Sequence, residues 1–370
     1  MAADSLRVAR TAYRERAVRW GFIWALWCAI LWGAWYVPGF ALFFEEPFAS
    51  FQNTTGEGLQ TAAAITALNA VFVLAAMFIW TGALGKVKDY GRTIRQVKNV
   101  SKWFFFGAAF GGPIAIYGTY LAIYQIGAQF GAVAALLYPI VGAALARVWY
   151  KEKITQRALL GIIVVIAGGV VIFTPGLAAE LTGTGEGAWL GYVGGLMSIV
   201  GWGIEGAIAA RVLDVTDPDV GLTIRFTAES LYWLVLIVPI SAIWVGDNIV
   251  SLMWNGLQNG PVLLWLGLAG LTFGFCYVSW YKAFPLIGVG RGQAIADLYG
   301  MFALVWLTIF TLSLPAWQFW VGAAIAIVGG FIMYTERRDV LEVIRVVPGV
   351  REAAPIPEFT GGTSDITGRS

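Results

Sequence analysis

The segment from Tyr120 to Gly169 recurs, without a gap, as the segment from Tyr281 to Gly330. An offset of 161 residues, the distance from Tyr138 to Tyr299, also aligns Ala122 with Ala283, Gly131 with Gly292, Gly161 with Gly322, and Gly168-Gly169 with Gly329-Gly330. Closer to the start of each copy, an offset of 170 residues carries Gly21 onto Gly191 and Trp32-Gly33 onto Trp202-Gly203. The chain is therefore built from two copies of one unit, and its fold must accommodate that duplication.

The repeated unit is apolar enough to lie in a membrane. Apolar residues make up 59% of the 370 residues and charged residues 12%, about half of the roughly 25% typical of soluble domains. Apolar runs of about 20 residues recur along the chain, and a run of that length spans the ~30 Å hydrocarbon layer as a helix. We predict an all-α polytopic membrane protein with ten transmembrane helices. The predicted spans are 20–43, 61–83, 103–125, 129–149, 157–175, 189–211, 221–245, 262–284, 290–312 and 317–335.

Basic residues lie at alternate ends of these spans, which predicts their orientation. Lysines and arginines precede the first span and fill the loops after the second and fourth spans, whereas the opposite loops carry Glu45, Glu46, Glu57, Glu180, Glu186 and Asp247. We therefore place both termini on the cytoplasmic side of the cytoplasmic (inner) membrane. Because each copy of the unit contains five spans, an odd number, the two copies are expected to be inverted repeats.

These boundaries divide the chain into five parts. Residues 1–19 form a basic cytoplasmic N-terminal arm, 20–175 the first five-helix repeat, and 176–188 an outer-side linker containing the sequence TGTGEG. Residues 189–335 form the second five-helix repeat, and 336–370 a cytoplasmic tail that we predict to be largely disordered. A membrane protein built from two inverted halves is the usual construction of a secondary transporter, whose site lies between the halves.

The stretch YPIVGAALARVWYKEKITQRALLGIIVVIAGGVVIF, from Tyr138 to Phe173, resembles two consecutive helices of the drug/metabolite transporter superfamily, EamA type. The matching positions are Pro139, Glu152, Thr155, Gly161 and Gly168, together with the Trp-Gly pairs of the first and sixth spans. The second repeat departs from the pattern, with Gly300 and Ser313 in place of the proline and the glutamate. The resemblance implies ten helices in two inverted repeats, a central substrate cavity, alternating access and no cofactor. Members of the family move amino acids, amines, nucleotide sugars and drugs.

Two acidic residues inside predicted spans are candidate substrate-binding residues, because lipid exposure of such groups costs several kcal/mol. Glu205 lies midway through the sixth span, three residues after Trp202 and therefore on the same helix face. Asp297 lies about two turns into the ninth span. At the position of Glu205 the first repeat has Trp35.

Aromatic residues accompany these acids and are predicted to line the substrate cavity. They are Trp32, Trp35, Tyr36, Tyr120, Tyr138, Trp202, Tyr281 and Tyr299. Aromatic rings beside a carboxylate bind an organic ammonium group, at about 0.5–2 kcal/mol per desolvated ring. The same stripes also suit simple helix packing, since aromatic residues make up 15% of the chain.

The remaining charges in or near the spans have plainer interpretations. Arg225 and Glu229, four residues apart, are expected to form an intrahelical ion pair. Lys282 and Arg291 are expected to reach the cytoplasmic surface. If they pointed inward instead, they would bind a carboxylate and favour a zwitterionic substrate such as an amino acid.

The composition argues against other functions. The chain has no histidine and two cysteines, Cys28 and Cys276, in separate apolar runs, so it offers no metal cluster, cofactor motif or catalytic dyad, and we predict no enzyme activity. Nothing in it indicates nucleic-acid binding. A receptor or scaffold is disfavoured because no sizeable soluble domain accompanies the repeat.

We therefore expect a secondary transporter that moves a small organic solute, an amine or quaternary ammonium compound. The alternative is an amino-acid or metabolite exporter of the same family. Its partners would be the solute and the lipid bilayer. Coupling to H⁺ or Na⁺ stays open, as do the direction of transport and the choice between monomer and homodimer.

Overall fold

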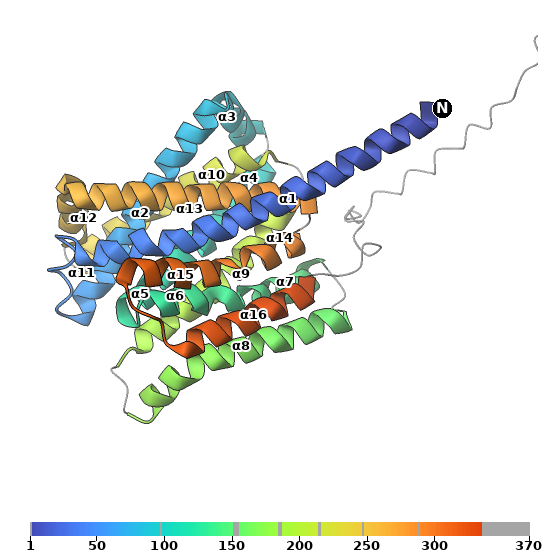
Figure 1. Ribbon diagram of the computed structural model, residues 1–370. Coiled ribbons are helices and arrows are strands. Elements are labelled where there is room, and N and C mark those ends of the chain that lie inside the picture. Colours follow the sequence, from blue (N-terminus) through green and yellow to red (C-terminus); the bar gives the residue numbers. More distant parts are fainter. Residues whose placement is uncertain are drawn as a thin grey trace, which may run out of the picture. The chain divides into compact units, whose positions relative to one another are not determined.

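The computed structural model describes residues 2–96, 98–150, 155–183, 187–213, 216–245, 248–287 and 289–334, and every element in these ranges is helical (Figure 1). The α-helices are α1 (Ala2–Ala41), α2 (Thr55–Ala83), α3 (Val87–Gln96), α4 (Lys98–Ala109), α5 (Tyr117–Gln125), α6 (Ala128–Ala134), α7 (Tyr138–Tyr150), α8 (Gln156–Leu181), α9 (Trp189–Val212), α10 (Pro218–Leu231), α11 (Val238–Val245), α12 (Asn248–Gln258), α13 (Gly260–Ile287), α14 (Val289–Ala296), α15 (Tyr299–Thr311) and α16 (Trp317–Tyr334). Between them lie the 3₁₀ segments η1 (Leu42–Phe44) and η3 (Ala135–Leu137), and the π-helical segments η2 (Phe110–Ile116) and η4 (Tyr232–Ile237).

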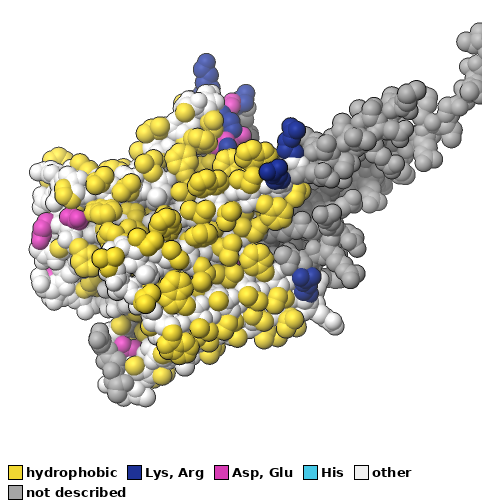
Figure 2. Space-filling view, in the orientation of Figure 1, with side chains coloured by type: hydrophobic (Ala, Val, Ile, Leu, Met, Phe, Trp, Pro, Cys, Tyr) yellow, Lys and Arg dark blue, Asp and Glu magenta, His cyan; other side chains and the backbone are white. Residues whose placement is uncertain are grey.

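Nine helical stretches within the described ranges are long and apolar enough to cross a membrane, and they overlap nine of the predicted spans. The last predicted span contains α16, whose apolar stretch Trp317–Ile332 is shorter than the others. In the face that Figure 2 shows, hydrophobic side chains run along the helices, and charged side chains gather near the helix ends. This distribution is that of a polytopic membrane protein.

Some predicted boundaries differ from the observed helices. α8 continues to Leu181, so the predicted linker 176–188 begins with helix, because its first residues, GLAAEL, are mostly good helix formers. The predicted arm 1–19 is likewise helical from Ala2 and continuous with the first span. The predicted tail, 336–370, lies outside the described residues.

Two predicted spans, 129–149 and 290–312, are interrupted where continuous helices were expected. In the first, α6 ends at Ala134 and α7 begins at Tyr138. In the second, α14 ends at Ala296 and α15 begins at Tyr299. The 161-residue offset superposes these two breaks. A proline directly after Tyr138 suits the first turn of a new helix, where its missing N–H costs nothing, whereas the acidic side chain of Asp297 favours a turn over the helix interior.

Close helix contacts occur in reciprocal pairs under the two offsets. A Cβ added to Gly33 on α1 would lie 2.7 Å from Phe302 Cβ on α15, and one added to Gly203 on α9 would lie 2.5 Å from Val141 Cβ on α7. Exchanging the two copies of the unit converts the first contact into the second.

The same reciprocity relates α8 and α16, which lie side by side (Figure 1). A Cβ on Gly168 would lie 2.7 Å from the Gly322 carbonyl oxygen, and one on Gly329 would lie 2.8 Å from the Gly161 carbonyl oxygen. Exchanging the two copies of the unit again converts one contact into the other.

Candidate functional site

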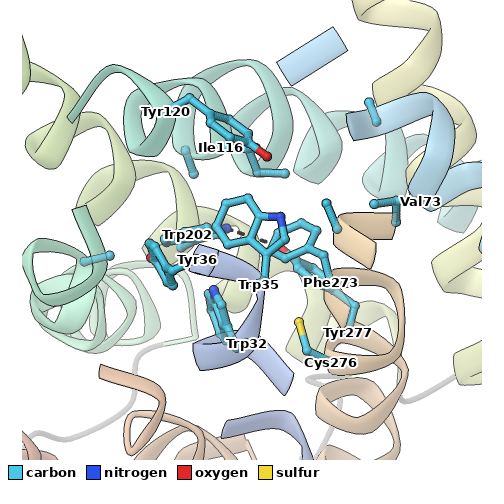
Figure 3. Close-up of a cluster of buried hydrophobic side chains, with 14 of the residues drawn as sticks. Trp32, Trp35, Tyr36, Val73, Ile116, Tyr120, Trp202, Phe273, Cys276 and Tyr277 are labelled. Carbon is cyan, nitrogen blue, oxygen red and sulfur yellow. Dashed lines mark hydrogen bonds between the residues drawn. The ribbon is translucent and has the colours of Figure 1, made fainter. Parts of the chain in front are cut away.

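Six aromatic side chains from α1, α9, α13 and α15 form a buried aromatic cluster, part of which Figure 3 shows. We define it as Trp32, Trp35, Tyr36, Trp202, Tyr277 and Tyr299; all six are fully buried, at 0% exposure. The helices that carry these residues belong to both copies of the unit.

The equivalent residues Trp32 and Trp202 contact each other at the centre of this aromatic cluster. Their ring centroids lie 5.0 Å apart in an edge-to-face arrangement, which the quadrupoles of aromatic rings favour. Tyr299, the first residue after the break between α14 and α15, stacks on Trp32 at 4.5 Å. Tyr36 stacks on the same tyrosine at 6.2 Å. Two residues that the repeat makes equivalent are thus brought together where the two halves meet.

An ion cluster lies beside the aromatic cluster, and we define it as Glu205 on α9 with Arg225 and Glu229 on α10. The Arg225 guanidinium donates from Nε to Glu205 Oε1 at 2.5 Å and from Nη1 to Glu229 Oε2. The three side chains are at most 1% exposed. The guanidinium carbon also lies 4.2 Å from the Phe226 ring centroid and 4.8 Å from that of Tyr277. The predicted intrahelical pair therefore exists, and it extends to a second helix.

Tyr277 joins the two clusters through a chain of hydrogen bonds. The Trp202 indole donates from Nε1 to the Tyr277 hydroxyl at 3.1 Å, and that hydroxyl donates to Glu205 Oε2 at 2.9 Å. Glu205 thus accepts hydrogen bonds on both of its oxygens. A change in charge at Glu205 would therefore act directly on Tyr277 and, through it, on Trp202 at the centre of the aromatic cluster.

The π-helical segment η2 makes room for the ion cluster. A Cβ on Gly111 would lie 1.9 Å from Glu205 Oε2, and a Cβ on Gly112 would lie 2.5 Å from Glu229 Cγ. Only glycine fits at these two positions, because any side chain there would overlap the carboxylates. π-Helical bulges of this kind occur frequently at functional sites.

A narrow pocket reaches the ion cluster between α4, α9, α10 and α13. It is too narrow to admit a water molecule. Glu205, Arg225 and Tyr281 are among its lining residues, and Trp103, which also lines it, is 42% exposed. In this conformation the carboxylates are therefore closed off from solvent.

The other predicted site residues are all buried but are distributed around the aromatic cluster. Tyr120 packs against Trp35 of the aromatic cluster, with ring centroids 5.4 Å apart. Trp35 in turn donates from Nε1 to Asn69 Oδ1 on α2 at 3.2 Å. Tyr138 lies 6.3 Å from Trp32, and its side chain also lies beside Asp297. Asp297 occupies the break between α14 and α15 and is 2% exposed.

The predicted site did not include Arg225, Glu229, Tyr277 or Asn69, all of which the structure places at or next to these clusters. A signal existed for two of them. Asn69 is an isolated amide in an apolar run, and Arg225 is a cation inside a predicted span, near its start. The pairing of Arg225 with Glu205 required knowledge of how α9 and α10 face each other.

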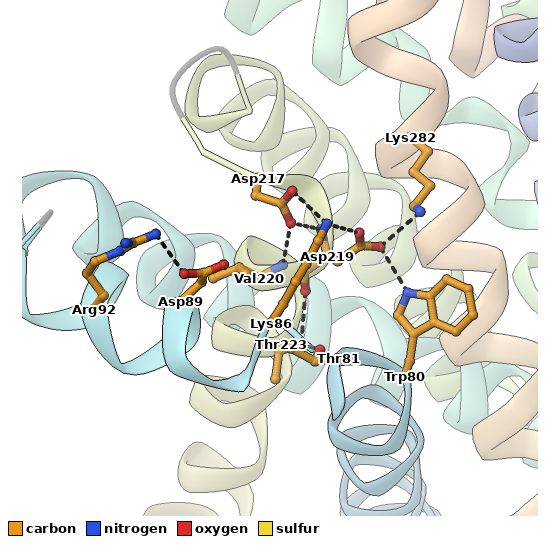
Figure 4. Close-up of polar contacts among 10 residues, drawn as sticks. All are labelled: Trp80, Thr81, Lys86, Asp89, Arg92, Asp217, Asp219, Val220, Thr223 and Lys282. Atoms are coloured by element: carbon orange, nitrogen blue, oxygen red, sulfur yellow. Dashed lines mark hydrogen bonds and ion pairs between the residues drawn. The ribbon is translucent and has the colours of Figure 1, made fainter. Parts of the chain in front are cut away.

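Lys282, a residue of the alternative site, takes part in a different polar network (Figure 4). Its Nζ lies 3.3 Å from Asp219 Oδ1, and Asp219 Oδ2 accepts from Lys86 Nζ at 2.7 Å. The start of α10 supports this network, because Asp217 caps the helix and also accepts from Lys86 at 2.8 Å. Burial lowers the pKa of Lys86, but its hydrogen bonds to the two aspartates outweigh that effect, so its pKa lies above the ordinary lysine value. The side chain of Arg291 lies outside the described residues.

No family model matches this chain, and no curated protein matches it. Among the solved structures that match, one described as "Crystal structure of protein" is 18% identical, and the alignment covers 84% of this chain and 95% of the other, with a TM-score of 0.43. A similarity at this level carries no argument about function.

Proposed function

We propose that this protein is a secondary transporter of the drug/metabolite transporter superfamily, EamA type, that moves a small organic amine across the cytoplasmic membrane by alternating access. Ten helices form two inverted five-helix repeats in this proposal, with both termini on the cytoplasmic side. The observation that carries it is the buried carboxylate of Glu205, hydrogen-bonded through Tyr277 to the aromatic cluster at the junction of the two halves.

The helix packing supports the inverted repeat. The reciprocal contacts of Gly33 with Phe302 and of Gly203 with Val141 are those expected of halves related by a two-fold axis. The equivalent breaks before Tyr138 and Tyr299 add to this support. In transporters with inverted repeats, interrupted helices at corresponding positions of the two halves mark the substrate site.

The charges of the ion cluster support an amine as the solute. Two carboxylates and one guanidinium leave one negative charge that no described side chain neutralises. A monovalent ammonium group would complete the balance if it took the place of the Arg225 Nε at Glu205. The guanidinium would then keep Glu229 as its partner. The rings of Trp202 and Tyr277 would face the ammonium, at about 0.5–2 kcal/mol per ring.

The close packing of the aromatic cluster means that this conformation is closed. Because the rings leave no room and the pocket beside Glu205 is too narrow for water, the solute must enter when the halves separate on one side. Alternating access provides that opening on each side in turn.

One observation favours the second candidate, an amino-acid or metabolite exporter. The Nη2 atom of Arg225 is buried and donates no hydrogen bond, so the carboxylate of a zwitterion would give it an acceptor. Lys282, the other cation considered for this role, is already engaged by Asp219.

Uptake by proteoliposomes tests the proposal and separates the two candidates. The purified chain is assayed with tetraethylammonium, primary amines and neutral amino acids, with and without a pH gradient. We expect amine uptake by the wild type and none by Glu205→Gln, which should still insert and fold, while Glu46→Gln, a change at an exposed glutamate, should transport normally. Full transport by Glu205→Gln would remove the central role of this carboxylate. Uptake of amino acids in preference to amines would select the exporter.

A further inference from the structure

Hydrogen bonds are distributed unequally between the two carboxylates of the ion cluster. Glu205 accepts from Arg225 Nε on one oxygen and from the Tyr277 hydroxyl on the other. Glu229 accepts from Arg225 Nη1 on Oε2, but its Oε1 atom is buried and has no hydrogen-bond donor. Donors thus reach both oxygens of Glu205 but only one oxygen of Glu229.

The surroundings of Glu229 offer no second cation. The ionisable groups that interact with it are Arg225 on its own helix, Glu205 on α9 and Tyr120 on α5. From the segment η2, Gly112 lies directly against the Glu229 side chain. Among the described residues, one guanidinium is therefore shared between two buried carboxylates.

A proton on Glu229 Oε1 would correct the charge imbalance of the ion cluster. It would bring the ion cluster to neutrality, which matters because an uncompensated buried charge costs several kcal/mol. A proton on Glu205 would restore neutrality too, but it would disrupt an acceptor that already has two good donors.

We propose that Glu229 is the proton-binding group of the transport cycle and that Arg225 is a counter-ion that passes between the two carboxylates. This inference rests on the proposed transport of an amine. Without solute, the O–H bond on Glu229 is formed and Arg225 neutralises Glu205.

Arrival of the ammonium group reverses these assignments. The ammonium pairs with Glu205, the guanidinium moves fully onto Glu229, and the Glu229 proton leaves to water on the side toward which the site is open. The total charge of the site is the same before and after. The cycle therefore exchanges one proton for one monovalent amine without net charge movement.

Infrared difference spectroscopy of the full-length protein in liposomes tests the assignment independently of transport. Spectra at about pH 6 and about pH 8 are compared in the carbonyl region, where a protonated buried carboxyl group absorbs. We expect Glu229→Asp, which keeps the number of acidic groups, to shift the frequency of a protonated-carboxyl band that Glu205→Asp and the exposed control Glu46→Gln leave in place. A shift of that band in Glu205→Asp but not in Glu229→Asp, or no effect of either change, would overturn the proposal. Size-exclusion profiles identify any variant that has not folded.

A second measurement uses tetraethylammonium as the probe. We expect Glu229→Gln to lose the accumulation of tetraethylammonium that a pH gradient drives, and the exposed control Glu46→Gln to retain it. Retained accumulation in Glu229→Gln would refute the role of Glu229. If the wild type moves no solute at all, the proposed function fails, and the infrared result still decides where the proton resides.

Discussion

Removing the single cation of the ion cluster should harm the protein more than removing one of its carboxylates. Arg225→Gln leaves Glu205 and Glu229 buried together without a counter-ion. Breaking a buried ion pair on one side costs about 3–5 kcal/mol, because an unpaired charge stays in the interior. Glu205→Gln leaves a neutral pair between Arg225 and Glu229, and the amide oxygen can still accept from Tyr277. Its cost should be about 1 kcal/mol, the size of one net hydrogen bond.

The double variant Arg225→Gln/Glu205→Gln gives this prediction its sharpest form. It has one buried carboxyl group without a cation where Arg225→Gln alone has two, so it should be more stable than that single variant. The free energy of unfolding is measured by denaturant titration in mixed micelles, followed by tryptophan fluorescence. The charge account would be refuted if Glu205→Gln were as destabilising as Arg225→Gln, or if the two changes were simply additive.

Three further predictions concern packing, hydrogen bonding and pH. Gly168→Ala should destabilise the protein by about 1–3 kcal/mol because the added methyl group forces α8 away from α16. Gly56→Ala, whose added Cβ meets no atom within 4 Å, serves as the control in the same unfolding titration. Equal effects of the two changes would contradict the close approach of α8 to α16. Trp35→Phe should cost about 1–3 kcal/mol because it leaves the buried Asn69 oxygen without a donor, so that a neutral result in that titration would argue against the hydrogen bond. The pKa of Lys86 is raised, so its ion pairs stabilise the protein fully below the ordinary lysine value of 10.5 and are lost as pH rises through the higher folded-state value. The wild type should therefore lose its stability advantage over Lys86→Met only at strongly alkaline pH. A loss of that advantage near neutral pH would contradict this prediction.

The sequence predicted those parts of the fold that depend on local apolar length and on self-similarity. Runs of apolar residues predicted where the membrane helices lie, because about 20 consecutive apolar residues are enough to span the membrane as a helix. The repeat paired Trp32 with Trp202, and burial of Glu205 followed from the cost of exposing a carboxylate to lipid. These inferences need no knowledge of how helices face each other.

The features that the sequence did not predict are tertiary. The ion pair between Arg225 and Glu205 depends on which faces of α9 and α10 pack together. The hydrophobic periodicity of the sequence does not determine that packing. The span 290–312 is apolar on both sides of Asp297 and contains no proline, so the sequence predicts a continuous helix where the structure has a break. No sequence signal distinguishes Tyr277, because its link between Trp202 and Glu205 depends on the position of α13.

The modification rate of Cys276 tests the central claim most directly, that the closed aromatic cluster opens to water during transport. This thiol on α13 is fully buried beside the aromatic cluster (Figure 3), and Cys28→Ala makes it the single cysteine of the chain. A membrane-impermeant thiol reagent is added to proteoliposomes with or without tetraethylammonium. We predict that modification is slow at rest and accelerates during solute exchange. A thiol that stays equally inert while solute crosses the membrane would contradict the account.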